Sequence, residues 1–212
     1  MKKFLLFLFM VYGSCAFAQK SFFGVDAGIN VANQRTFFPY NSTVGNQIAF
    51  HGNVVKPVIS VFYQREISNK LEARIKASYA GFGFKDPNAM YYSYNGTVYF
   101  LKNVDINYLM LPINLYYKAN SHLLLGGGPY ISFLVGASQI NNQDVTSVYH
   151  KNDFGIILGG EYDIYKSFSL NISYVIGAKN IWLNDKDSYG YTYSVTNRAL
   201  QFTLIYKFKK GN

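Results

Sequence analysis

The sequence contains one cysteine among its 212 residues, and that cysteine is Cys15. Because a disulfide needs two thiols and thiolate metal sites need several, this chain alone can form neither an internal disulfide nor a multi-cysteine metal centre. Charged residues are also scarce, at 15%, whereas soluble domains carry about 25%. Aromatic residues reach 18%. Low charge combined with abundant Tyr and Phe favours a membrane protein with aromatic girdles over a soluble domain.

Long apolar runs are missing outside the amino-terminal segment, so no segment there approaches the ~20 residues of a transmembrane helix. The amino-terminal run, Phe4–Tyr12, is itself too short; it follows Lys2 and Lys3 and precedes an Ala-Phe-Ala sequence that ends at Ala18. These features predict a secretory signal peptide at residues 1–18 and one mature domain at residues 19–212. Lipidation of Cys15 is the alternative, but the residues before it lack the aliphatic side chain that a lipoprotein signal favours.

The predicted mature chain is basic. Cleavage after Ala18 removes Lys2 and Lys3 from the 20 basic residues, so that 18 remain against 11 acidic ones, a net charge of +7. A basic exported protein meets anionic outer-membrane lipid and lipopolysaccharide, which are its predicted partners. Export argues against nucleic acid as a partner.

The clearest structural signal is a strict alternation of residue types between Asp153 and Gly177. One face is aliphatic and aromatic, and its members include Phe154, Ile156, Leu158, Tyr162, Ile164, Phe168, Leu170, Ile172, Tyr174 and Ile176. The other face is mostly small and polar. Since successive side chains of a strand point to opposite faces, the pattern predicts two strands joined near Tyr165-Lys166. Their length suits a tilted membrane-crossing strand of about 9–11 residues.

Six further segments show related alternation, at residues 21–31, 55–67, 71–84, 104–117, 122–135 and 198–208. Short turns near Ser68-Asn69, Ala119-Asn120 and Tyr165-Lys166 alternate with long polar segments at residues 32–53, 85–103, 138–152 and 179–197. This rhythm predicts an all-β protein, an eight-stranded antiparallel transmembrane β-barrel in meander order, with short periplasmic turns and long extracellular loops. The even strand count places both mature termini on the periplasmic side.

Two irregular features are expected in this barrel. Pro112 lies inside the fourth strand, where it suggests a bulge at which the two faces exchange. Asn95-Gly96 is the dipeptide that suits a type I′ hairpin turn. The third and fourth strands are therefore expected to continue beyond the membrane as a two-stranded ribbon.

Several short motifs occur in order along these strands. They are Gly24 with Ala27-Gly28-Ile29-Asn30, Tyr108-Leu109 with Leu111-Pro112, Gly128-Pro129-Tyr130, Asp153-Phe154-Gly155 with Gly159-Gly160-Glu161-Tyr162, Ser173-Tyr174, and Tyr206-Lys207-Phe208. With them the chain resembles the PorT-like outer-membrane β-barrel family of Bacteroidetes. The resemblance implies an eight-stranded barrel without a cofactor. The name-giving member of the family is associated with protein secretion across the outer membrane, whereas many of its relatives have no assigned role.

Two sets of residues are candidate functional sites. The first is a luminal charge network, formed by the inward-facing residues Asp26, Glu72, Arg74, Lys76, Glu161 and Lys207. An eight-stranded lumen is filled by side chains, and buried charges must be paired, so the network is expected to plug the barrel. The second is a binding surface or aromatic belt of loop tyrosines, namely Tyr91, Tyr92, Tyr94, Tyr99, Tyr189, Tyr191 and Tyr193.

Catalytic and metal-binding residues are not predicted. His51 and His150 fall in outer loops while His122 adjoins a periplasmic turn, so the three histidines lie on opposite sides of the membrane. His150 near Ser147 and Asp153 is the one grouping that suits a hydrolase. The first hypothesis is a non-enzymatic integral outer-membrane protein with an interaction role in the envelope or in secretion. The alternatives are a lipid A-modifying hydrolase, and a soluble exported barrel that carries a ligand in an apolar interior.

Overall fold

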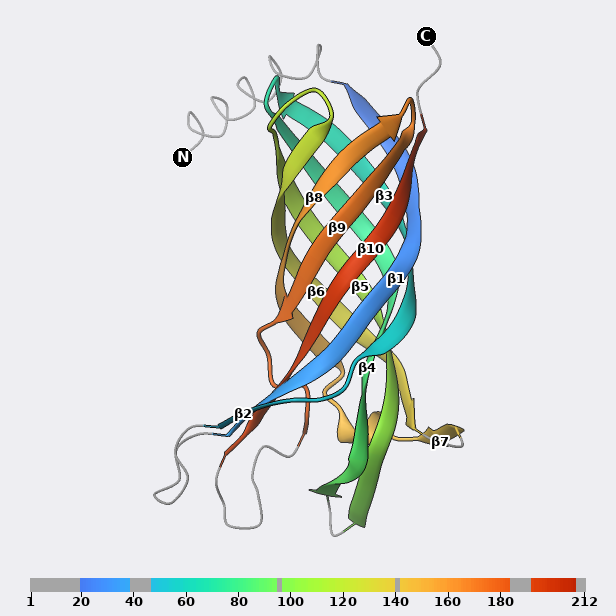
Figure 1. Ribbon diagram of the computed structural model, residues 1–212, viewed down its shortest axis with the longest axis vertical. Coiled ribbons are helices and arrows are strands. Elements are labelled where there is room, and N and C mark those ends of the chain that lie inside the picture. The colour runs from blue at the N-terminus through green and yellow to red at the C-terminus, as the bar shows by residue number, and fades with distance from the viewer. Residues whose placement is uncertain (1–19, 39–46, 95–96, 140–141, 184–191, 209–212) are drawn as a thin grey trace, which may run out of the picture.

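Eight long antiparallel strands form a sheet that closes on itself in the computed structural model (Figure 1). The structure describes residues 20–38, 47–94, 97–139, 142–183 and 192–208, without side chains at residues 38, 47–50, 86–94 and 97–100. The long strands are β1 (Ser21–Phe38), β3 (Val54–Ser68), β4 (Leu71–Tyr94), β5 (Thr97–Lys118), β6 (Leu123–Gln139), β8 (Asn152–Tyr165), β9 (Phe168–Gly177) and β10 (Ser194–Phe208). Each long strand pairs with its neighbours in chain order, and β10 pairs with β1. The predicted eight-stranded barrel is confirmed.

The two ends of the barrel differ (Figure 1). The tight turns β3–β4, β5–β6 and β8–β9 lie at one end, where β1 begins and β10 ends; we call it the short-turn end. The long connections lie at the opposite end, the loop end. They include the short strands β2 (Gln47–Phe50), paired with β1, and β7 (Gln143–Asp144), paired with β6. A 3-10 turn, η2, covers Thr146–Val148.

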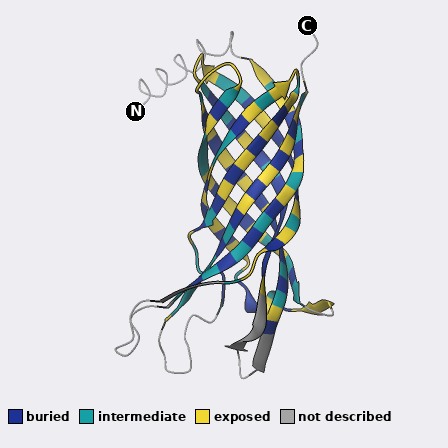
Figure 2. Cartoon of the chain, viewed as in Figure 1, coloured by how far each residue is buried: buried dark blue, intermediate teal, exposed yellow. Residues whose placement is uncertain are grey.

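Exposed and buried residues alternate along most of the barrel wall (Figure 2), although residues 80–84 of β4 are all buried. On β9, for example, Leu170 and Ile172 are 50% and 53% exposed, whereas Asn171 between them is 5% exposed. Apolar side chains therefore form the outer wall, as the alternation predicted, whereas the lumen holds both polar side chains such as Asn171 and buried apolar ones such as Ile205. The alternative of a soluble carrier is wrong, because it required the apolar face inside. Within the described residues, no helix has the length and hydropathy needed to cross a membrane.

Several strands are longer at the loop end than the sequence pattern indicated. β1 continues from Val31 to Phe38 and β10 begins at Ser194, and both stay paired through Phe37↔Ser194. The hydrophobic alternation stops where the apolar band ends, but backbone hydrogen bonding continues beyond it. The ribbon predicted around Asn95-Gly96 is present in the backbone, since Tyr94 pairs with Thr97.

Pro112 produces neither a bulge nor an exchange of faces. The register between β4 and β5 is the same on both sides of it, with Ile75↔Ile113 and Ser78↔Met110 paired. The irregularity in β5 lies instead at Asn107 and Tyr108, opposite β6. The φ angle that the proline ring fixes is compatible with an extended strand, and proline removes only one backbone hydrogen-bond donor. The strand therefore continues through Pro112 without interruption.

The glycine run of β6 allows a close approach between strands. A Cβ atom at Gly126 would lie 2.1 Å from the carbonyl oxygen of Leu115, and one at Gly128 would lie 1.9 Å from that of Ile113. A side chain at either position would therefore force β5 and β6 apart. The run therefore permits the close packing of β5 against β6.

Candidate functional site

Arg74 lies at the centre of the polar interior near the short-turn end. It extends inward from β4, and its Nη2 atom lies 2.6 Å from Oε2 of Glu161 on β8, on the other side of the lumen. Its Nε donates a hydrogen bond to Oε1 of Gln64 at 2.6 Å. The guanidinium also lies 4.5 Å and 4.7 Å from the ring centroids of Phe62 and Tyr116. Pairing and ring contacts together offset part of the hydration that this buried cation has lost, while its Nη1 atom has no hydrogen-bond partner among the described residues.

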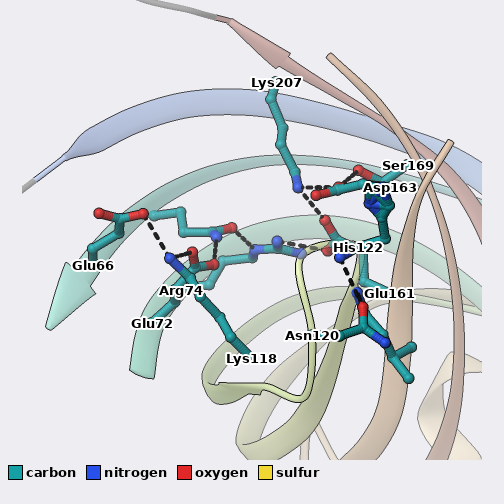
Figure 3. Close-up of polar contacts among 12 residues, drawn as sticks. Glu66, Glu72, Arg74, Lys118, Asn120, His122, Glu161, Asp163, Ser169 and Lys207 are labelled. Atoms are coloured by element: carbon teal, nitrogen blue, oxygen red, sulfur yellow. Dashed lines mark hydrogen bonds and ion pairs between the residues drawn. The ribbon is translucent and has the colours of Figure 1, made fainter. Parts of the chain in front are cut away.

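The network continues from Glu161 towards β10 (Figure 3). Lys207 Nζ lies 2.6 Å from Glu161 Oε1 and 2.7 Å from Asp163 Oδ1. Asp163 also accepts a hydrogen bond from the Ser169 hydroxyl at 2.5 Å. Glu161 is thus shared by two cations, and the fully buried carboxylate has a partner for each oxygen.

In the other direction the network reaches β5. Gln64 Nε2 donates a hydrogen bond to Glu72, whose other oxygen lies 2.8 Å from Lys118 Nζ. Lys118 also lies 2.7 Å from Glu66 Oε1 at the rim. The polar chain therefore connects β3, β4, β5, β8, β9 and β10 across the lumen. We call these residues the short-turn network: Gln64, Glu66, Glu72, Arg74, Lys118, Glu161, Asp163, Ser169 and Lys207.

All six charged residues expected in the lumen point inward and make ion pairs. Lys76 and Asp26 form a separate pair at 2.6 Å, and the Ser60 hydroxyl donates to the other oxygen of Asp26 at 2.8 Å. The sequence did not indicate that Lys118 is the cationic partner of Glu72. It lies at the last position of β5, and only the strand register shows that it reaches Glu72.

The middle of the lumen holds a small polar cavity of about 10 Å³. Its lining includes Lys76, Asn114, Asn171, Ser173 and Gln201. A space of this size holds about one water molecule. The lumen at this level is therefore packed rather than open.

At the loop end the interior is closed by apolar side chains. We define the loop-end cluster as the buried residues Phe82, Phe84, Leu101, Val104, Ile106, Tyr108, Val145, Val148, Tyr149, Ile181 and Trp182. Two loops contribute to it and are held to each other and to β10, because the His150 amide donates to the Ile181 carbonyl at 2.8 Å and the Ile181 amide donates to the Val195 carbonyl at 2.9 Å. These bonds link the described parts of both loops to each other and to β10 beside the loop-end cluster.

An aspartate side chain hydrogen-bonds to the 3-10 turn in the first of these loops. The Thr146 amide donates to Oδ1 of Asp144 at 2.8 Å. Hydrogen bonds from the Thr146 side chain and backbone lower the pKa of the Asp144 carboxyl. The Thr146 hydroxyl in turn accepts a bond from the Ala137 amide at 2.9 Å, which fastens the loop to β6.

The seven predicted surface tyrosines are only partly described. Tyr193 packs edge-to-face against Trp182, with ring centroids 5.8 Å apart, and so contributes to the closed mouth. The backbones of Tyr91, Tyr92, Tyr94 and Tyr99 lie in the β4–β5 ribbon, whereas their side chains are outside the described residues. Tyr189 and Tyr191 are also outside the described residues. The binding surface stays a prediction.

Asp153, the acid of the hydrolase grouping, lies inside the barrel. It is 2% exposed, and its Oδ2 accepts hydrogen bonds from the Tyr130 hydroxyl at 3.2 Å and from Asn197 at 3.1 Å. His122 lies at the short-turn end beside Tyr162, while His51 contacts Thr36 at the loop end. Among the described residues no group of three His, Cys, Asp or Glu is arranged to hold a metal ion.

A closed barrel of eight antiparallel strands, with an apolar outer wall and a lumen occupied by side chains, is the architecture of small outer-membrane barrels. A model of the outer membrane protein beta-barrel domain family matches residues 17–182, and the chain belongs to this family. Membership implies a location in the bacterial outer membrane. No match was found among curated proteins.

Solved structures of outer-membrane proteins are similar to this chain. Neisserial surface protein A is 14% identical, with a TM-score of 0.54, over 89% of this chain and 99% of that one. Ail of Yersinia pestis is 12% identical, with a TM-score of 0.45, over 88% and 99% of the two chains. Outer membrane protein W of E. coli is 14% identical, with a TM-score of 0.42, over 91% and 100%. The likeness to Neisserial surface protein A shows a shared fold.

Proposed function

We propose that the protein is a non-enzymatic, non-conducting outer-membrane barrel that serves as an interaction protein of the cell envelope. The observation that carries this proposal is the filling of the lumen by described side chains at three levels. The short-turn network occupies one end, the cavity in the middle has about 10 Å³, and the loop-end cluster occupies the other. A barrel built as a pore needs a continuous aqueous path, which such filling does not provide.

The loop end is the side from which we expect partners to be bound. Its β4–β5 ribbon extends the wall beyond the apolar band and carries four of the seven predicted tyrosines (Figure 1). Rigid aromatic side chains on a strand scaffold suit protein recognition. We further infer membership of the PorT-like branch of Bacteroidetes, with export by a cleaved signal peptide at residues 1–18. The partners proposed are outer-membrane lipid, lipopolysaccharide and proteins of the envelope or of secretion.

Photocrosslinking in intact cells tests this role. A photoreactive amino acid replaces Tyr92 on the ribbon, and a matched probe replaces Lys166, which is exposed at the short-turn end. We expect a discrete crosslinked envelope protein from position 92 that is missing from position 166. Crosslinks to no protein from position 92, in cells where the barrel is folded, would contradict the interaction role.

The hydrolase alternative is tested in the same strains. Deletion of the gene and the His150→Ala variant should both leave the lipid A mass spectrum unchanged. The loss or gain of an acyl chain that depends on His150 would replace the proposal with an enzymatic function. The secreted protein profile of the deletion strain separately tests the link to secretion.

A further inference from the structure

Two arginines lie side by side on the outer wall of the barrel, where apolar residues predominate. Arg198 is on β10 and follows the outward alternation of Leu200, Phe202 and Leu204. Arg35 is on β1, and its neighbours Gln34 and Thr36 are both buried towards the lumen. Both arginine side chains therefore point out of the barrel.

The strand register makes these arginines diagonal neighbours. Arg198 pairs with Asn33, and Arg35 pairs with Thr196, on the adjoining strands β1 and β10 (Figure 1). Diagonal positions on one face of an antiparallel pair are within reach of long side chains. Arg35 is close enough to Arg198 for the two positive charges to act on each other.

The same register shows where the two arginines lie along the barrel axis. The continuous run of outward apolar residues on β1 and β10 extends from the pair Phe23↔Phe208 to the pair Val31↔Leu200. Asn33↔Arg198 comes next, and Phe37 lies on the same face beyond the two arginines. The arginines therefore lie at the loop-end border of the apolar band. In outer-membrane barrels the longer loops face outward, so this border meets the headgroups of the outer leaflet.

Neither guanidinium has an acidic partner in the part of the chain that the structure describes. Arg198 Nη1 donates to the Gly177 carbonyl at 2.8 Å, which leaves most of its donors for another acceptor. The Nε atom of Arg35 is buried and has no acceptor among the described residues. Asp153 attracts Arg198 electrostatically but lies on the inner face, where it accepts hydrogen bonds from Tyr130 and Asn197.

We propose that Arg35 and Arg198 form a binding site for the phosphate group of a lipid headgroup in the outer leaflet. Two neighbouring guanidiniums supply a fork of donors that matches phosphate oxygens, and the anion cancels the repulsion between them. The acyl chains of the same lipid lie along the apolar wall below, over Val31 and Leu200. The inference rests on the membrane placement in the proposed function, but not on its interaction role.

Native mass spectrometry of the full-length protein in detergent tests the site. The probes are bisphosphorylated lipid A and the same lipid A after removal of its phosphates. The double variant Arg35→Gln/Arg198→Gln should retain the bisphosphorylated lipid at least about tenfold more weakly than the wild type, a loss of about 1.4 kcal/mol. The wild type should prefer the phosphorylated lipid, and the double variant should retain both lipids equally.

The control is Lys70→Gln/Lys166→Gln, which removes the same charge from exposed positions at the short-turn end. It should bind like the wild type. If the Gln variant does not fold, Arg35→Lys/Arg198→Lys replaces it, and should weaken binding because lysine lacks the planar fork.

Two results would overturn the site. One is equal retention of both lipids by the wild type. The other is displacement of the phosphorylated lipid by millimolar inorganic phosphate, since the site would then take free anions rather than a lipid. Neither result bears on crosslinking from the ribbon, so failure of this site is distinguishable from failure of the proposed function.

Discussion

The two ends of the barrel interior are closed by opposite chemistry. At the short-turn end the closure is ionic, with Arg74 paired to Glu161 at 2.6 Å. At the loop end it is apolar, with Ile181 and Trp182 buried under the loops. An ion pair needs accurate geometry to offset desolvation, and strands joined by tight turns supply it. Apolar burial is non-directional, so it suits an end that is closed by longer loops.

The largest effect is expected at the centre of the ionic end. Arg74→Ala leaves Glu161 buried with one of its cations removed, and should cost about 3–5 kcal/mol of unfolding free energy. Denaturant titration of the barrel in lipid vesicles measures this cost. The double variant with Glu161→Ala should cost less than the sum of the two single variants, because the residues share one network. Additive costs would contradict a coupled network.

A substitution in the loop-end cluster should act locally. Ile181→Ala removes a fully buried side chain and should destabilise the protein by about 2–5 kcal/mol. We expect this loss to appear chiefly as easier local opening of the loop that contains residue 181. Hydrogen exchange should speed up at the amides of His150 and Ile181 and stay unchanged on β8 and β9. Ile156→Ala on the outer wall is the control. Uniform acceleration over the whole barrel would show that the loop end is not a separate unit.

The apolar wall that both ends share can be tested on β9. Leu170→Arg places a charge on the lipid face, and should cost about 2–4 kcal/mol near the bilayer midplane. Leu170→Met keeps the face apolar and serves as the control. Equal folding free energies for the two variants in lipid would mean that this face does not meet the membrane core.

The smallest effect is expected at the rim of the ionic end. Glu66 and Lys118 form an ion pair in which the side chains are 28% and 24% exposed. Glu66→Gln should therefore cost about 0–1 kcal/mol in the same titration. A cost as large as that of Arg74→Ala would remove the distinction between the centre and the rim of the network.

The sequence indicated the architecture and the inward residues, because one alternating pattern encodes both. Leu170, Asn171 and Ile172 show this directly, since their order alone assigns each to a face. The sequence did not show where the strands end at the loop end. Residues 32–38 of β1 remain paired with a neighbouring strand although their sequence has no alternating apolar pattern.

The sequence could not predict which acidic residue pairs with which basic residue in the lumen, because the pairing depends on the register between neighbouring strands. Counting from the pair Tyr94↔Thr97 would place Lys85 opposite Ile106, but an irregularity between Lys85 and Met90 shifts it to Asn103. Lys118 and Glu72 therefore could not be matched by counting. The Arg35–Arg198 neighbours likewise emerge only from the register of β1 with β10.

The central claim is that the lumen is sealed at both ends, and planar-bilayer recording tests it most directly. Purified wild-type protein, reconstituted and shown to be folded, should pass no steady current across a range of voltages. Stable, large open-channel currents from the same preparation would contradict the sealed lumen and the proposed function with it.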